Sequence, residues 1–131
     1  MRPLLGALAL LAALGSPAAA GHAPMAPLLT IDPASLERLT AAGRPVTVID
    51  VRPVEAYRGG RLPGARSIPL NALIPRRREV PTERIVVLYG AAGVDEAAAA
   101  SRYLRAAGHA NVFVLEGGFA GWQAQGHGVE R

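Results

Sequence analysis

The 131-residue chain contains no cysteine and no lysine. Without cysteine it can form no disulfide, so its fold must be held by packing alone, and any chemistry that needs a thiolate is excluded. All 14 basic side chains are arginine, against 10 acidic ones, which in so alanine-rich a chain we attribute to genomic composition. The formal net charge of +4 is small and its arginines are scattered. The composition therefore does not indicate a nucleic-acid-binding protein, which needs a basic face.

The sequence also gives little indication of a metal site or of a serine hydrolase. The three histidines, His22, His109 and His127, show no ligand spacing with one another or with acidic residues, so we expect neither a metal site nor a cofactor. Ser67 and Ser101 have no neighbouring histidine, which gives a serine hydrolase no support. The run 76–78 of three arginines is the one cluster of like charge, and we interpret it as a solvated loop.

The first 20 residues have the order of a secretory signal peptide. A basic start at Arg2 precedes an apolar run from Leu4 to Leu14, and a small-residue site follows at 18–20. The apolar run is shorter than the roughly 20 residues that a bilayer span needs, although an uncleaved anchor is the alternative. We expect cleavage after Ala20 and an exported protein, periplasmic or secreted, that is not membrane-bound after cleavage.

The remaining chain predicts one α/β domain. Residues 21–28 are expected to form a flexible lead-in and residues 29–131 a single domain. Asp32 and Pro33 predict a helix start, because Asp can cap the helix and Pro fits its first turn. Apolar, largely β-branched runs predict three buried strands, at 46–51, 85–88 and 112–115.

A helix is predicted between two of these strands, and it implies that the two strands run parallel to each other. Residues 95–107 carry acidic residues at the start, arginines near the end and Gly108 as a stop. A strand, helix and strand joined in this way form a βαβ unit, whose strands are parallel. A further short strand is predicted at 66–68. The predicted fold class is α/β, a small central parallel sheet with helices on both faces.

The loop between the strand at 85–88 and the helix at 95–107 has the form of an anion cradle. Small residues at such a strand-to-helix connection allow backbone N–H groups and a helix N-terminus to face a ligand. Enzymes built this way commonly place a nucleophile at the first loop position, which here is Gly90. The loop therefore predicts a site without a visible catalyst. Its candidate residues are Gly90, Ala91, Ala92, Gly93, Val94 and Asp95.

A set of motifs along the chain resembles a rhodanese-homology domain. The set includes an Asp-x-Arg that ends a strand, a Leu-Pro-Gly-Ala turn and a Gly-Gly-x-x-x-Trp tail; the residues are Asp50, Arg52, 62–65, Gly117, Gly118 and Trp122. Each piece is weak alone, but the set is specific, and the resemblance runs from about residue 29 to 128. A single domain of this kind behind a signal peptide is similar to the small periplasmic rhodaneses of the phage-shock type.

The resemblance implies a sulfurtransferase in which a cysteine thiolate takes sulfur from thiosulfate, becomes a persulfide and passes the sulfur on. Depending on whether the loop is anchored from its start or its end, the family's cysteine position falls on Gly90 or on Ala91. Neither residue is cysteine. Asp95 and Glu96 would in addition repel an anionic donor, although both also suit a helix N-terminus.

Two classes of function remain open. The first is a catalytically inactive domain that binds a small anion or a protein partner. The alternative is an enzyme of this family that acts on an anionic substrate without cysteine, or an accessory to a partner domain that carries the cysteine. We expect the loop 90–94 to present several amides in a shallow pocket near Asp50 and Arg52, which are expected to brace the neighbouring loops. Trp122 is expected to anchor the core.

Overall fold

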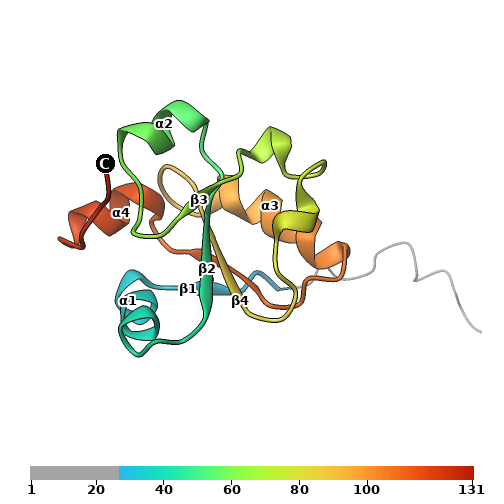
Figure 1. Cartoon of the computed structure of the whole chain (residues 1–131), viewed down its shortest axis with the longest axis horizontal. Helices are drawn as coiled ribbons and strands as arrows, with labels where there is room; N and C mark the ends of the chain where they lie inside the picture. The colour runs from blue at the N-terminus through green and yellow to red at the C-terminus, as the bar shows by residue number, and fades with distance from the viewer. Residues whose placement is uncertain (1–26) are drawn as a thin grey trace, which may run out of the picture.

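The computed structural model describes residues 27–131 (Figure 1). The predicted signal peptide at 1–20 and most of the predicted lead-in lie outside the described residues. Within them the chain forms a five-stranded sheet of order β1-β5-β4-β2-β3, in which every neighbouring pair is parallel. Its strands are β1 (Thr30–Ile31), β2 (Val46–Asp50), β3 (Arg66–Ser67), β4 (Ile85–Tyr89) and β5 (Val112–Leu115).

Helices cover both faces of this sheet, which confirms the predicted α/β class. The helices are α1 (Pro33–Ala41), α2 (Val54–Gly59), α3 (Asp95–Ala106) and α4 (Gly118–Ala124), with 3₁₀ turns η3 (Leu70–Ala72) and η4 (Arg77–Glu79). Helix α1 begins as the sequence predicts, because the carboxylate of Asp32 accepts the Ser35 N–H at 3.1 Å. The hydrogen bonds from Ser35 also lower the pKa of Asp32.

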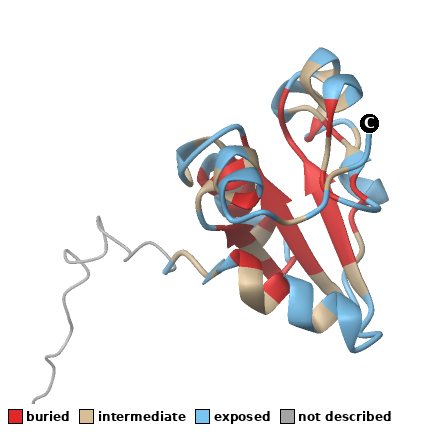
Figure 2. Cartoon of the chain, turned by 90° about the vertical axis from the view of Figure 1, so that its left-hand side faces the viewer, coloured by how far each residue is buried: buried red, intermediate tan, exposed pale blue. Residues whose placement is uncertain are grey.

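The central strands are buried on both sides, which explains their continuous apolar sequence. On one face Ile49 and Leu88 pack with Leu104 of α3, and on the other Val87 packs with Leu36 of α1 and Trp122 of α4. Trp122 is buried and donates its indole N–H to the Gly128 carbonyl at 2.8 Å, so the expected core anchor is confirmed. Figure 2 shows the strands as the buried centre, with exposed residues on the surrounding turns.

Some elements were not expected from the sequence. The structure adds β1, α2 and α4 to the predicted set. Residues 27 and 28 had been placed in a flexible lead-in, but Leu28 packs against the core beneath α3, and the Leu29 carbonyl accepts the Val114 N–H at 2.9 Å. Leu28 at the end of the predicted lead-in is thus in contact with the core. Among residues 27–131 no helix has the length and apolar character needed to cross a membrane.

Candidate functional site

The ends of β2 and β4 lie side by side at the carboxyl edge of the sheet. Asp50 and Tyr89 are paired in the strand register, so the residues that follow each strand emerge next to each other. In open α/β sheets this edge is where ligands bind. Most candidate residues from the sequence, Asp50, Arg52 and the loop 90–94, are therefore brought together here.

Asp50 and Arg52 form a buried ion pair. Asp50 is 0% and Arg52 6% exposed, and the guanidinium donates to both carboxylate oxygens, with 2.6 Å between Nη2 and Oδ2. Nη2 also donates to the Gly60 carbonyl at 2.6 Å, which ties the end of α2 to the end of β2. Burial alone would lower the pKa of Arg52, but the hydrogen bonds and charge of Asp50 outweigh it and raise that pKa.

Two aromatic rings complete this cluster. The Arg52 guanidinium lies 4.1 Å from the Phe119 ring centroid and 5.5 Å from that of Tyr89, both within cation–π range. The Tyr89 hydroxyl donates to Asp50 at 2.7 Å and accepts the Leu62 N–H at 3.2 Å. Burial, together with the Asp50 carboxylate, raises the pKa of Tyr89 well above its ordinary value of 10.0. Every member of this Asp50–Arg52–Tyr89 cluster thus has its partners inside the fold.

This cluster holds loops together and does not line an open pocket. The sequence predicts that Asp50 and Arg52 brace the neighbouring loops, and in the structure both side chains are buried under Phe119 and the α2 segment. Tyr89 and Phe119 also belong to this site, and the motifs in the sequence do not indicate them. The position of Tyr89 as the last residue of a buried strand was the signal available for it.

The loop Gly90–Val94 is held from the side by α4. The carbonyls of Gly90 and Ala91 accept the N–H groups of Phe119 and Ala120, each at 2.9 Å. Gly118 makes this approach possible, since it adopts φ +60° and a β-carbon there would lie 2.8 Å from Ala92 N. The loop therefore keeps a fixed shape, with Gly90 buried and residues 91–93 exposed.

The carboxylate of Glu96 occupies part of the cradle. Its Oε1 accepts the Ala91 N–H at 3.0 Å, and a β-carbon built on Gly90 would overlap Oε1 and lie 3.0 Å from Glu96 Cβ. Asp95, by contrast, is exposed and makes no side-chain hydrogen bond to the rest of residues 27–131. The two carboxylates that the sequence treated alike thus differ, because only Glu96 turns back over the loop.

An apolar pocket of about 450 Å³ opens next to Glu96. Val51, Val54 and Leu70 contribute to its walls. Among residues 27–131, Leu70 and Ile74 are large hydrophobic side chains that are exposed, at 40% and 56%. The pocket at this part of the carboxyl edge, with Val51, Val54, Leu70, Asn71 and Glu96 among its lining residues, is called the edge pocket below.

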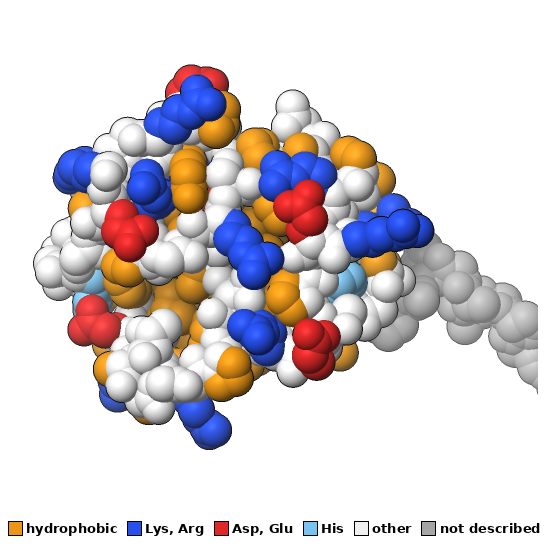
Figure 3. Space-filling model, in the orientation of Figure 1, with side chains coloured by type: hydrophobic (Ala, Val, Ile, Leu, Met, Phe, Trp, Pro, Cys, Tyr) orange, Lys and Arg blue, Asp and Glu red, His pale blue; other side chains and the backbone are white. Residues whose placement is uncertain are grey.

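Charged groups elsewhere are dispersed. Arg76 pairs with Glu79 at 2.8 Å, while Arg77 and Arg78 are exposed, so the arginine run is a solvated turn as expected. Figure 3 shows arginines spread over one face of the molecule with carboxylates between them.

The histidines in the described part of the chain lie apart from each other. His109 is buried near Pro81, whereas His127 pairs with Glu37 at 2.6 Å. Within the part of the chain that the structure describes, no three possible metal ligands are grouped.

Comparison with known proteins agrees with this geometry. A family profile described as the rhodanese-like domain matches residues 32–125, and the chain belongs to this family. The uncharacterized protein YqhL of Bacillus subtilis is 38% identical over 86 residues, covering 66% of this chain and 68% of that protein. A sulfurtransferase of Allochromatium vinosum is 31% identical over 96 residues, covering 73% and 89%.

Solved structures show the same fold. The rhodanese-like domain from an Anabaena protein, solved by NMR, has a TM-score of 0.71 and 33% identity and covers 77% of each chain. A rhodanese-related protein from Thermoplasma volcanium has a TM-score of 0.70 and 26% identity, covering 78% of this chain and 97% of the other. The chain is thus a rhodanese-like domain with sulfurtransferase relatives and no cysteine in its sequence.

Proposed function

We propose that this protein is an exported, catalytically inactive rhodanese-like domain that serves as a binding module. The observation that carries the proposal is the occupied cradle: Gly90 stands at the strand end, and Glu96 takes the Ala91 amide. Sulfur transfer from thiosulfate needs a thiolate that attacks the outer sulfur, forms an S–S bond and releases sulfite. No side chain of the exposed loop residues 91–93 can make that bond.

An enzyme that uses the same loop without cysteine is less well supported. The residues at 90–94 are glycine, alanine and valine, which neither attack nor transfer protons. The nearest carboxylate, Glu96, is hydrogen-bonded to the loop itself. A negative charge at that point also opposes an anionic substrate, by about 1 kcal/mol or more at a partly exposed site.

A protein partner fits the edge pocket better than a small anion does. The pocket walls are largely apolar, and Leu70, which lines the pocket, is 40% exposed. Apolar side chains that gather at one exposed place mark interaction surfaces more often than scattered ones do. We therefore place the partner's apolar side chain in the edge pocket, next to the Glu96 carboxylate.

The catalytic part of the proposal is tested by rebuilding the nucleophile. We expect no thiocyanate above background from the purified protein with thiosulfate and cyanide, and no persulfide by intact mass. Gly90→Cys should give feeble activity because Glu96 overlaps the new side chain. Adding Glu96→Ala should raise the initial rate about tenfold, since it removes both the overlap and the charge.

Asp95→Ala in the Gly90→Cys background is the matched control, because Asp95 carries the same charge but its exposed carboxylate forms no hydrogen bond with the loop. Equal rates for the Glu96→Ala and Asp95→Ala double variants would show that Glu96 does not close the site. Thiocyanate formed by the unaltered protein at a rate that falls when Glu96 is replaced would overturn the assignment as a non-catalytic domain.

The binding part is tested by photo-crosslinking from position 71. A photoreactive residue in place of Asn71, which is exposed and lines the edge pocket, should give one discrete adduct in cells that produce the protein, and Leu70→Asp should abolish it. The same residue in place of Glu83, exposed before β4, is the control and should give none. Adducts of equal yield from both positions would refute the edge pocket as a partner site. Fractionation of these cells tests export, which requires the protein to start at Gly21 outside the cytoplasm.

A further inference from the structure

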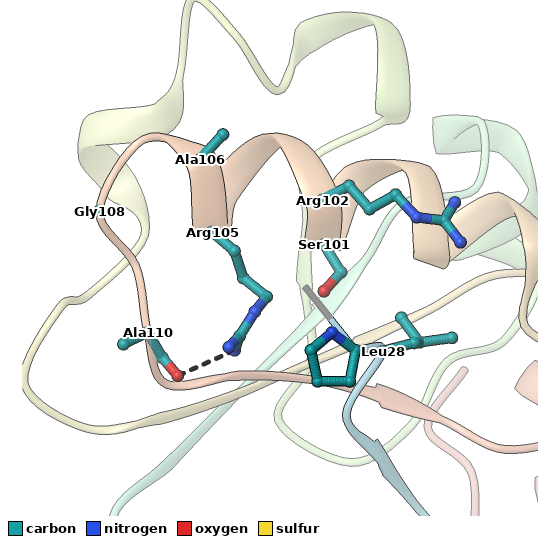
Figure 4. Close-up of a pocket in the computed structure, with 8 residues that line it drawn as sticks. Leu28, Ser101, Arg102, Arg105, Ala106, Gly108 and Ala110 are labelled. Atoms are coloured by element: carbon teal, nitrogen blue, oxygen red, sulfur yellow. Dashed lines mark hydrogen bonds between the residues drawn. The ribbon is translucent and has the colours of Figure 1, made fainter. Parts of the chain in front are cut away.

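A second pocket, of about 400 Å³, lies on the outer side of the second half of α3 (Figure 4). It is bounded by that helix, by the turn that leads into β5 and by the first described residues of the chain. We call it the α3 pocket. Its apolar wall consists of Pro27, Leu28, Ala106 and Ala110. It shares no residue with the edge pocket or with the loop 90–94.

Two buried polar atoms at this pocket have no partner among residues 27–131. They are the hydroxyl oxygen of Ser101 and Nε of Arg105. Ser101 is 0% exposed, and Figure 4 shows its hydroxyl on the side of α3 that faces Leu28. Buried polar groups are almost always hydrogen-bonded, because leaving one unpaired costs free energy. Two such atoms at one apolar pocket point to a polar group that the pocket receives.

Arg105 presents one free edge of its guanidinium. Its Nη1 donates to the Ala110 carbonyl at 3.0 Å, which fixes the side chain across the pocket, as the dashed line in Figure 4 shows. The opposite edge, formed by Nε and Nη2, has no hydrogen bond to any residue from 27 to 131. Two parallel N–H groups of this kind match the two oxygens of a carboxylate.

The charge around the pocket is positive and uncompensated in the described residues. Arg102 lines the pocket one turn before Arg105, and neither side chain forms a salt bridge within residues 27–131. An apolar wall with cationic groups on one side selects a ligand with an apolar body and an anionic head. A pocket of this volume is within the range that holds small molecules.

We propose that the α3 pocket binds a small amphipathic carboxylate, with its head on the free Nε–Nη2 edge of Arg105 and on the Ser101 hydroxyl. The apolar body lies against Leu28, Ala106 and Ala110, and Arg102 adds longer-range attraction. A compact, strongly hydrated anion such as thiosulfate lacks the apolar body that the wall requires. This binding is independent of the sulfur chemistry that the family implies, since it uses the other end of α3.

The test is an NMR titration of the full chain with octanoate. We expect saturable shifts of the amides of Leu28, Ser101 and Ala110, and about tenfold weaker binding of the uncharged analogue 1-octanol. Arg105→Met keeps the length of the side chain and should weaken octanoate at least tenfold, because a hydrogen-bonded charge is lost. Arg84→Met, which removes an arginine exposed outside the pocket, should leave the affinity unchanged.

Ser101→Ala is the second variant, and it removes no hydrogen bond within the described fold. It should weaken octanoate about threefold to tenfold without lowering the thermal midpoint, which separates loss of binding from loss of folding. The proposal is overturned if octanoate and 1-octanol bind equally, if Arg105→Met and Ser101→Ala bind like the unaltered protein, or if no saturable shift occurs at these amides. The last result includes the case in which residues 1–26 fill the pocket.

Discussion

The neighbouring strands β2 and β4 end at the same edge of the sheet but lead into opposite environments. At the end of β2 the charged pair Asp50–Arg52 is buried, hydrogen-bonded and covered by aromatic rings. At the end of β4 the loop 90–94 has only small side chains and valine, exposed at 91–93, and receives the carboxylate of Glu96. The charged side chains at the end of β2 thus stabilise the fold. The loop at the end of β4 has the shape of a reactive site but no reactive side chain.

The contrast fits the proposal made above, in which the scaffold of the site is kept and its reactive side chain is not. Buried polar clusters are costly to alter piecemeal, because each change leaves a partner unpaired. Gly90 makes no side-chain contact of its own, but it is buried beside Glu96, so a larger side chain there would also require Glu96 to move. Membership of the rhodanese-like family therefore does not by itself establish activity.

The largest effect is expected from Arg52→Met. It leaves the Asp50 carboxylate buried without its cation, and we expect the free energy of unfolding to fall by about 3–5 kcal/mol. Urea unfolding measures this value. Arg58→Met, which removes an exposed arginine of α2, is the control and should change it little. An Arg52→Met effect as small as that of Arg58→Met would break the distinction between the two strand ends.

Gly118→Ala is expected to have the next largest effect. The new β-carbon would lie 2.8 Å from both Ala92 N and Gly90 O at a residue with φ +60°, so strain and crowding add to about 2–4 kcal/mol. Gly126→Ala separates the two contributions, because Gly126 has φ +80° but no atom within 4 Å of its β-carbon. It should cost about 1 kcal/mol. Similar losses for both variants would mean that α4 does not hold the loop closely.

The dependence of stability on alkaline pH tests the buried cluster of Asp50, Arg52 and Tyr89, because Tyr89 ionises in that range. Its pKa is raised in the folded state, so its stabilising contribution is complete below the unfolded value of 10.0 and is lost as pH rises above it. We expect the free energy of unfolding to fall by about 1.4 kcal/mol per pH unit from this group above pH 10. The measurement is urea unfolding between pH 9 and about 11. Tyr89→Phe should remove that part of the slope, and an unchanged slope would contradict the assignment.

The smallest effect is expected from Glu96→Ala. Losing one hydrogen bond to a partly exposed loop should cost about 1 kcal/mol or less, but hydrogen exchange of the Ala91 amide should become faster, as measured by NMR. Asp95→Ala is the control and should leave that amide unchanged. If both variants had the same effect on exchange, the two carboxylates would be equivalent, as the sequence alone suggested.

Much of the fold could be predicted because its signals are local. The strands β2, β4 and β5 are apolar, largely β-branched runs, and α1 and α3 begin and end at recognisable residues such as Asp32 and Gly108. The missed elements have weak local signals. Strand β1 has two residues, α2 follows Pro53 without a side-chain cap, and α4 starts after Gly117 with φ +80°.

The site was predictable only in part for a related reason. Motifs located the strand ends, but the direction of a side chain is decided by tertiary packing. Nothing in the sequence distinguishes Glu96, which turns back to Ala91, from its neighbour Asp95. Likewise, the burial of Arg52 depends on Phe119, which lies 67 positions further along the sequence.

The strand order also constrains when the chain can fold. Strand β1, at residues 30–31, pairs with β5, at 112–115, and Arg61 forms a bridge with Glu130. Nearly the whole domain must leave the ribosome before these contacts can close, and such distant pairings make folding slow. A nascent chain of this topology stays open while it is being made. Under the proposed export, this delay would keep the chain extended for a secretion channel that passes unfolded polypeptides.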